Sequence, residues 1–267
     1  MICLLSVFAF RKQQPSLLVI PAGKTVAERF TTPSGFTRIK SDANSFGAFL
    51  QNTSLKPNGT LVHYYNGQEK PNKVAAAVLN LDVGAKDLQQ CADAVMRLRA
   101  EYLYQSKQYD KLHFNFTSGF KADYAKWRTG YRIAVKGNTV NWVKSSKESI
   151  SYESFREYMN MVFTYAGTAS LSKELKLISQ KDMQIGDVLI LGGSPGHAVI
   201  VVDMAENAKT NKKLFMVAQS YMPAQDIHIL INKNDPAISP WYKLEPNAEQ
   251  INTPEWDFFG DEQLKRF

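Results

Sequence analysis

The sequence is poor in the residues that metal sites and disulfide frameworks need. Its 267 residues include only two cysteines, Cys3 and Cys91, and four histidines, and no H-E-x-x-H motif occurs. Two cysteines are too few for a disulfide framework or a cysteine-based zinc site, and the histidines show no metal-ligand spacing. We therefore expect no metal and no other cofactor.

The chain also lacks a basic block and a hydrophobic run long enough to cross a bilayer. Lys and Arg exceed Asp and Glu by 32 to 25, but they are scattered, which argues against a nucleic-acid-binding protein. The apolar run at residues 2–10 (ICLLSVFAF) is shorter than the roughly 20 residues that span a membrane. It fits a secretory signal without its basic start, or alternatively a hydrophobic first strand. We expect a secreted or cell-envelope protein (periplasm or outer membrane), attached to a membrane only through this segment, and leave lipidation of Cys3 open.

What the chain does contain is the composition of a folded domain. Hydrophobic residues make up 44% and charged residues 21%, which excludes wholesale disorder. Residues 11–26 are rich in Gln, Pro and Gly, which is typical of a tether. We expect a signal-like segment and tether at residues 1–25, followed by a single domain at residues 26–267.

Periodicity predicts a mixture of helices and antiparallel strands. The strongest helix covers residues 88–105, and a further helix covers residues 152–165. A hairpin is expected at residues 131–143 around Lys136-Gly137-Asn138. The remaining strands are expected at residues 60–65, 73–81, 112–117, 188–191, 198–203, 213–219 and 227–231. Helices and strands do not alternate regularly, so the pattern predicts an α+β fold.

Cys91 lies near the start of the strongest predicted helix. Asp87 can cap the helix, and Gln90 three residues later completes a capping-box pattern. N–H groups at a helix start stabilise a thiolate and lower the pKa of a thiol, which suits a nucleophile. A lone cysteine on an apolar helix face is otherwise a small buried hydrophobe.

His197 follows a glycine-rich turn and opens an apolar strand. A histidine at the mouth of a strand is well placed to act as a general base, although a polar turn residue fits the same position. Gln219 ends the next predicted strand and can orient the imidazole by a hydrogen bond, without supplying charge. Asp203 at the far end of the histidine strand is the alternative partner for His197.

Two other motifs are poorer candidates for chemistry. Residues 192–196 (GGSPG) fit the pattern of a serine-hydrolase elbow, but an apolar strand follows where a helix is needed, and Pro195 has no N–H to donate. Ser170 and Lys173 fit an S-x-x-K motif, but neither of the companion motifs of penicillin-recognising enzymes follows. Ser170 fits a helix cap better.

The order of a cysteine at a helix start, a histidine at a strand start and a polar residue on the next strand resembles the papain-like amidohydrolases and peptidases. It is most similar to their bacterial cell-wall branch, the cysteine, histidine-dependent amidohydrolases/peptidases. The Gly-Asp-apolar and Gly-His-apolar runs of that branch match residues 186–188 and 196–201. The resemblance covers residues 87–94 and 186–220, and it makes residues 107–182 an insertion.

This resemblance implies a papain-like domain, in which a helix bearing Cys91 packs on an antiparallel sheet bearing His197, with an N-terminal elaboration. It implies a cysteine hydrolase that acts on amide bonds of cell-wall or other peptides. Cys91 would be the nucleophile, His197 the base and Gln219 the orienting residue. The oxyanion would lie at the Cys91 N–H, with the side chain of Gln89 or Gln90 as a second donor.

More of the chain resembles an uncharacterised family of secreted proteins or lipoproteins from gut Bacteroides-type bacteria. The matching residues are 29–36, 88–104, 194–202, 219–225 and 265–267. No activity follows from that family. The alternative to the enzyme is therefore a non-catalytic envelope protein that binds a glycan or peptide on the same fold. Trp127, Arg128 and Trp241 are the candidate binding residues, because aromatic faces suit sugars and peptides.

Overall fold

The computed structural model describes residues 18–246 and 248–267. The signal-like run, Cys3 and most of the expected tether lie outside the described residues. Among the helices within the described ranges, none combines the length and the apolar character that crossing a bilayer requires.

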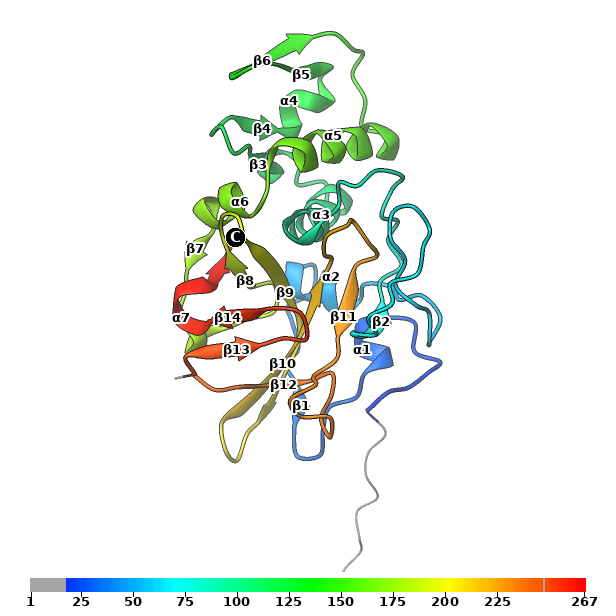
Figure 1. The fold of residues 1–267 in the computed structure, drawn as a ribbon, viewed down its shortest axis with the longest axis vertical. Helices are drawn as coiled ribbons and strands as arrows, with labels where there is room; N and C mark the ends of the chain where they lie inside the picture. The colour runs from blue at the N-terminus through cyan, green and yellow to red at the C-terminus, as the bar shows by residue number, and fades with distance from the viewer. Residues whose placement is uncertain (1–17, 247) are drawn as a thin grey trace, which may run out of the picture.

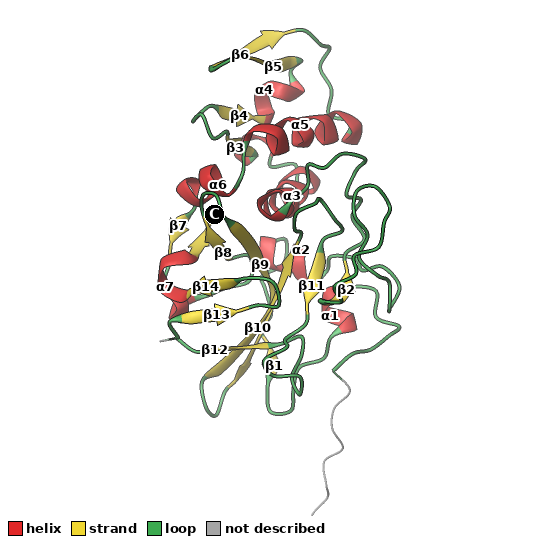
Figure 2. Cartoon of the chain, in the orientation of Figure 1, coloured by secondary structure: helices red, strands yellow, loops and turns green. Residues whose placement is uncertain are grey.

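The fold is α+β, as the periodicity predicted, and it is built on one large antiparallel sheet (Figures 1 and 2). The main path of the sheet runs β2-β11-β10-β9-β8-β15-β7, while β1 pairs with β9 and β12 with β10. The strands are β1 (Thr37–Arg38), β2 (Ala75–Val78), β7 (Lys176–Leu177), β8 (Val188–Leu191), β9 (His197–Asn207), β10 (Lys212–Gln219), β11 (His228–Leu230), β12 (Tyr242–Leu244) and β15 (Leu264–Arg266).

The central strand β9 is buried on both faces because its apolar residues alternate between two cores. Ala198, Ile200 and Val202 belong to one hydrophobic cluster, whereas Val199 and Val201 belong to the other. In a strand, successive side chains point to opposite faces, so an unbroken apolar run marks a strand covered on both sides. This is why residues 198–202 read as an uninterrupted hydrophobic stretch.

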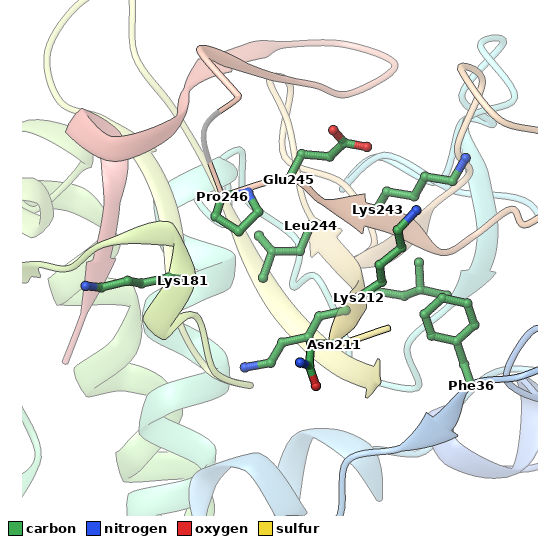
Figure 3. A pocket seen from close by; sticks show the side chains of 10 residues that line it. Phe36, Lys181, Asn211, Lys212, Lys243, Leu244, Glu245 and Pro246 are labelled. Atoms are coloured by element: carbon green, nitrogen blue, oxygen red, sulfur yellow. The ribbon is translucent and has the colours of Figure 1, made fainter. Parts of the chain in front are cut away.

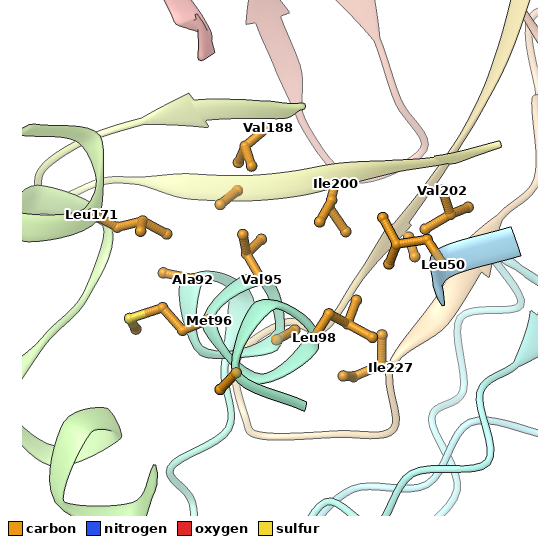
Figure 4. Close-up of a cluster of buried hydrophobic side chains, with 14 of the residues drawn as sticks. Leu50, Ala92, Val95, Met96, Leu98, Leu171, Val188, Ile200, Val202 and Ile227 are labelled. Carbon is orange, nitrogen blue, oxygen red and sulfur yellow. The ribbon is translucent and has the colours of Figure 1, made fainter. Parts of the chain in front are cut away.

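Helix α3 (Cys91–Gln105) covers the first face of the sheet. Val95 and Leu98 of α3 pack in the same cluster as Ile200 and Val202 of β9, with Leu50 of α2 (Phe46–Gln51) beside them (Figure 4). A short helix α1 (Val26–Arg29) completes this side. Helix α3 packs on β9, and its N-terminus lies near the start of that strand, since the first residues of both line one cavity.

The second face is covered by the C-terminal part of the chain. The hairpin of β13 (Gln250–Asn252) and β14 (Asp257–Phe259) places Phe258 in the second cluster with Val199 and Val217. Helix α7 (Gly260–Gln263) follows and leads into β15, which returns to the edge of β8. The turn of this hairpin holds residues 253–256, which reach the site described below.

Residues 107–165, the larger part of the expected insertion at residues 107–182, form a layer over α3 (Figure 1), whereas α6 packs on β8 and β7 belongs to the main sheet. The rings of Tyr104 on α3 and Phe155 on α5 stack with centroids 4.4 Å apart. The elements of residues 107–182 are η1 (Tyr109–Lys111), β3 (His113–Asn115), β4 (Lys121–Asp123), α4 (Tyr124–Arg128), β5 (Tyr131–Lys136), β6 (Thr139–Lys144), α5 (Tyr152–Tyr165), α6 (Thr168–Glu174) and η2 (Gln180–Asp182), with strand β7 between the last two.

Local predictions differ from the structure where tertiary contacts override them. Residues 60–65 were expected as a strand but form only isolated bridges, at His63 and Tyr64. Residues 18–25, which we assigned to the tether, pair with the folded part: the Ile20 N–H donates to the Arg29 carbonyl at 2.7 Å. Thr25 is the N-cap of α1, and its side chain accepts from the Glu28 N–H.

Candidate functional site

Cys91 is the first residue of α3, so its thiol lies at the helix N-terminus. The helix begins three residues later than expected, because Gln90 is the N-cap residue and its N–H donates to the Asp93 carboxylate at 3.0 Å. Asp87, the expected cap, instead accepts from the Ala224 N–H at 2.6 Å and from Gln90 Nε2 at 3.1 Å. The correction places Cys91 where backbone N–H groups have no intrahelical partner.

The Cys91 thiol is largely buried, and its pKa is high. Burial raises the pKa of the thiol to about 11, and the charge of Asp93 acts in the same direction. Hydrogen bonds from the Ala92 and Ala198 N–H groups oppose this rise. The expected lowering of the thiol pKa is therefore wrong, because the cost of burying a thiolate exceeds its stabilisation by these N–H groups. Cys91 is a neutral thiol at pH 7.

His197 opens β9, and its ring packs among aromatic side chains. The ring centroids of Tyr221, Trp256 and Phe258 lie 4.9, 5.3 and 5.9 Å from that of the imidazole. Burial lowers the pKa of His197 to about 4, although its hydrogen bond with Gln219 acts in the opposite direction. The imidazole is therefore neutral at pH 7, which is the form that can accept a proton.

Gln219 determines which nitrogen of His197 carries the proton. It ends β10, and its Oε1 lies 2.8 Å from His197 Nε2, so the hydrogen bond expected between them is present. The amide has one orientation, because Gln219 Nε2 lies 2.6 Å from a carboxylate oxygen of Glu255, and a carboxylate only accepts. His197 Nε2 thus donates to Gln219, and Nδ1 is left unprotonated.

A second histidine lies on the other side of Gln219. His228 on β11 is fully buried, and its Nδ1 donates to the Asp226 carbonyl at 2.9 Å. Its Nε2 lies 3.5 Å from Gln219 Nε2 and can accept the second N–H of that amide. Burial lowers the pKa of His228 to about 4, so this ring is neutral as well.

Cys91 and His197 line the same cavity, which has a volume of about 310 Å³. The walls are the N-terminus of α3, the β8–β9 loop and the segment from the end of α5 to the start of α6. Tyr221, Met222 and Trp256 form a further side. The backbone N–H of Ala198, the residue after His197, acts to lower the pKa of the Cys91 thiol, so the thiol lies close to the start of β9. A cavity of this size accommodates a small ligand or one end of a peptide.

The two expected oxyanion donors differ in their surroundings. Gln89 is fully buried, and Arg97 donates to its Oε1 at 3.0 Å. It is not among the residues that line the cavity, whereas Gln90 is. Tyr221, which sequence analysis did not select, also lines the cavity, and burial, followed by the charge of Glu255, raises the pKa of its phenol. The donors that the cavity lining offers are thus the Cys91 N–H, the side-chain amide of Gln90 and the phenol O–H of Tyr221.

Trp127 and Trp241 do not form the expected binding surface, because both indole rings are buried. Trp241 is fully buried and donates from its indole N–H to the Thr31 carbonyl at 2.9 Å. Trp127 is 3% exposed and donates to Ser154 in the layer over α3. Arg128 lies over the Tyr109 ring, 5.0 Å from its centroid, in that same layer. Both indole N–H groups have hydrogen-bond acceptors inside the protein and both rings are buried, so neither ring has a face free for a ligand.

Asp203 is not the partner of His197. Its carboxylate accepts from Arg38 at 2.8 Å and from Gln51 at 2.7 Å, at a buried position six residues along β9. Its role is to pair with Arg38 on β1. In the ranges 18–246 and 248–267, no three His, Cys, Asp or Glu side chains are placed to hold a metal ion.

A second cavity, of about 500 Å³, lies beside β10 and β12 and is basic. Figure 3 shows lysine side chains on both sides of Leu244 and Pro246. Lys243 pairs with Asp235 at 2.8 Å. The described residues that line this cavity include neither a cysteine nor a histidine, so it has no nucleophile and base pair. We therefore place the candidate chemistry at Cys91. The lining lysines are Lys181, Lys212, Lys213 and Lys243.

Glu255 and Tyr221 were missed by sequence analysis, and Trp256 was considered only as part of an aromatic binding surface and not as a neighbour of His197. Glu255 and Trp256 lie in the turn between β13 and β14, 36 and 37 residues from Gln219 in the chain. The sequence Pro254-Glu255-Trp256 contains no motif that predicts a contact with His197. Their place depends on the docking of a hairpin on the sheet, which local patterns do not encode.

The fold and the cavity together define an α+β protein in which a cysteine, a histidine and a glutamine converge at one end of an antiparallel sheet. The chain belongs to the family described as "Domain of unknown function (4846)", whose model matches residues 26–266. This confirms the expectation of an uncharacterised family. Neither the curated proteins nor the solved structures contain a match to the chain.

Proposed function

We propose that this protein is a cysteine hydrolase of amide bonds on a papain-like domain. The observation that carries the proposal is one cavity that holds both the Cys91 thiol, at a helix N-terminus, and a neutral His197, whose Nε2–H is bound to Gln219. A nucleophile and a base that line one cavity, with an orienting residue on the base, are the parts that nucleophilic catalysis needs.

The first half of the reaction cleaves the amide. The Cys91 sulfur attacks the carbonyl carbon, and its proton passes to His197 Nδ1 as the sulfur–carbon bond forms. The Cys91 N–H, with Gln90 or Tyr221, stabilises the oxyanion. The intermediate then collapses: the carbon–nitrogen bond breaks, and His197 returns the proton to the leaving amine. The product on the protein is a thioester of Cys91.

The second half releases the acid. His197 takes a proton from a water molecule, whose oxygen attacks the thioester carbon, and the carbon–sulfur bond breaks. The sulfur regains the proton from His197, and a carboxylic acid leaves. Because both groups are neutral at rest, the proton moves during the attack and not before it.

The lining of the cavity favours substrates without negative charge at the scissile bond. Its described lining contains no lysine or arginine to pair with a negative charge. The carboxyl groups in the lining are Asp87 and Asp93, and burial raises the pKa of Asp93 well above its ordinary value. A neutral peptide backbone or a basic side chain meets no repulsion there. Peptides, including peptidoglycan-like peptides of the cell envelope, are the substrate class that we propose.

The test is hydrolysis by the full chain of a panel of synthetic peptides and cell-wall stem peptides, followed by mass spectrometry. Cys91→Ala and His197→Ala should each lower the rate by about a thousandfold. A peptidyl epoxide should add one mass equivalent at Cys91 in the wild type and none in Cys91→Ala. Cys3→Ser is the matched control and should behave like the wild type. Hydrolysis that survives in Cys91→Ala would overturn the assignment.

One observation favours a second function, a non-catalytic binding protein. The Cys91 pKa of about 11 and the His197 pKa of about 4 mean that no thiolate–imidazolium pair exists in the resting cavity. A protein that only binds a peptide or glycan end needs no such pair. In that case the panel would show binding by calorimetry without hydrolysis, and Cys91→Ala would bind with unchanged affinity.

A further inference from the structure

A carboxylate lies directly behind the residue that orients His197. Gln219 is neutral and fully buried, and its Nε2 donates to Glu255 at 2.6 Å. The Glu255 carboxylate also takes a hydrogen bond from Lys70 at 2.7 Å and one from Asn72 at 3.3 Å. Contacts thus run from the His197 imidazole through the Gln219 amide to the charged carboxylate of Glu255.

The ion pair at the end of this chain is largely buried. The side chain of Lys70 is 5% exposed and that of Glu255 is 11% exposed. Lys70 also lies over the Tyr221 ring, 5.4 Å from its centroid, and Tyr221 packs on His197. Buried ion pairs are poor contributors to stability because desolvation offsets their attraction. A contribution to stability therefore does not explain why the Lys70–Glu255 ion pair lies beside Gln219.

We propose that Glu255 is a positioning residue of this site: it holds the Gln219 amide in a single orientation and places a negative charge in line with His197. This inference rests on the proposed function. Gln219 can orient the ring but cannot stabilise an imidazolium, whereas an aspartate or glutamate at its position would do both. Gln219 and Glu255 share those two tasks, and Lys70 limits the charge that reaches the ring.

Glu255 and Lys70 affect the pKa of His197 in opposite directions. The charge of Glu255 raises the pKa of His197, and the charge of Lys70 lowers it. Removing Glu255 should therefore make the imidazolium harder to form, and removing Lys70 should make it easier. The titratable groups that face the ring or its partners are Cys91 and Asp93 on α3, Tyr221 after β10, His228 on β11, and Lys70 and Glu255.

The experiment measures the rate at which the peptidyl epoxide alkylates Cys91 at pH 7.5, in the full chain carrying Cys3→Ser, because opening of the epoxide needs the proton that His197 carries from the thiol to the ring oxygen. We expect Glu255→Gln to slow alkylation about tenfold and Lys70→Met to speed it severalfold, since a pKa change of one unit is a tenfold change in protonation. In a chain that also carries Gln219→Leu, the effect of Glu255→Gln should fall below about twofold, because the coupling runs through the amide. Asp203→Asn, which removes another buried paired carboxylate, should leave the rate unchanged.

Two further measurements keep the test decisive. The double variant Lys70→Met/Glu255→Gln leaves no unpaired charge, so it should fold even where Glu255→Gln does not, with a rate between those of the single variants. Long-range proton–nitrogen NMR should show His197 only as the Nε2–H tautomer in the wild type. In Glu255→Gln both tautomers should appear, because a glutamine can accept or donate and the Gln219 amide can then turn round.

The outcomes separate this inference from the proposed function. Equal alkylation rates in all charge variants, with one unchanged His197 tautomer, would overturn the role of Glu255 even in an active hydrolase. Opposite rate changes and a mixed tautomer in a chain without hydrolysis would support the coupling between Glu255 and His197 and overturn the hydrolase.

Discussion

The hydroxyl oxygen of Ser220 lies 2.9 Å from the carbonyl oxygen of Gln89. Ser220 directly follows Gln219 at the end of β10, and Gln89 directly precedes the N-cap of α3. The contact therefore links the strand that orients His197 to the helix that presents Cys91. The same hydroxyl oxygen lies 2.9 Å from the Gln225 carbonyl oxygen, so its one proton is shared between two buried acceptors.

Ser220→Ala should lower the free energy of unfolding by about 1–3 kcal/mol, because it leaves buried carbonyl groups without a donor. Urea denaturation followed by circular dichroism measures this change. Ser118→Ala, at an exposed loop position, is the control and should change stability by less than about 0.5 kcal/mol. An equal effect of the two substitutions would mean that the Ser220 contact contributes nothing to holding β10 and α3 together.

Cys91 should alkylate slowly at neutral pH and faster as the pH approaches about 11, where its thiol ionises. A free thiol ionises near 8.5, so the folded protein should react more slowly than a small thiol at pH 7.5. The folded pKa lies above the unfolded one. The Cys91 contribution to stability is therefore complete below about pH 8.5 and is lost as the pH rises towards about 11. Iodoacetamide kinetics in Cys3→Ser check the first part, and a rate midpoint below pH 8.5 would contradict it.

His197 and His228 should make the protein lose stability in weak acid. Both have a pKa lowered to about 4 by burial, while an unfolded histidine binds a proton near 6.5. Between these values the unfolded chain binds more protons, so stability falls as the pH drops from about 6.5 to about 4, by up to about 3 kcal/mol per ring. Urea denaturation at pH 7 and pH 5 measures the slope. His228→Gln should flatten it, because it removes one of the two buried imidazoles.

Trp241 should prove to be a core residue. Trp241→Ala removes a fully buried ring and its hydrogen bond to Thr31, and it should cost about 3–5 kcal/mol of stability. Trp256→Ala, at a half-buried ring beside His197, should cost less stability but change the alkylation rate of Cys91. Thermal melting and iodoacetamide kinetics of the two variants distinguish these roles. A Trp241→Ala chain that melts with the wild type would restore it as a binding residue.

The start of the folded part can be located by truncation. A chain that begins at Leu18 keeps the Thr31 N–H to Leu18 carbonyl bond at 2.9 Å and the α1 cap at Thr25. A chain that begins at Val26 loses both, and it should melt about 5 °C or more below the longer one, because caps and backbone pairs each contribute about 1 kcal/mol. Equal melting temperatures would return residues 18–25 to the tether. Differential scanning calorimetry provides the comparison.

Local sequence patterns predicted the elements that carry the candidate site. Helix α5 and strand β8 have the bounds that periodicity indicated, and β10 extends the prediction by one residue. The placement of His197 at a strand start and of Gln219 at the end of its neighbour also followed from the chain. Hydrophobic periodicity records which face of an element is buried, so it reports element type and order well.

The tertiary structure alone decided the pKa values at the site and the contacts between residues far apart in the chain. The thiol pKa depends on how deeply α3 and β9 bury Cys91, and the tautomer of His197 depends on Glu255, which arrives on a hairpin 36 residues after Gln219. The burial of Trp241 depends on its contact with Thr31, 210 residues earlier. Local sequence patterns do not predict such contacts, because the contacts form where elements distant in the sequence pack together and exclude water. At Cys91, the cost of burying a thiolate outweighs the stabilisation that the helix N-terminus provides.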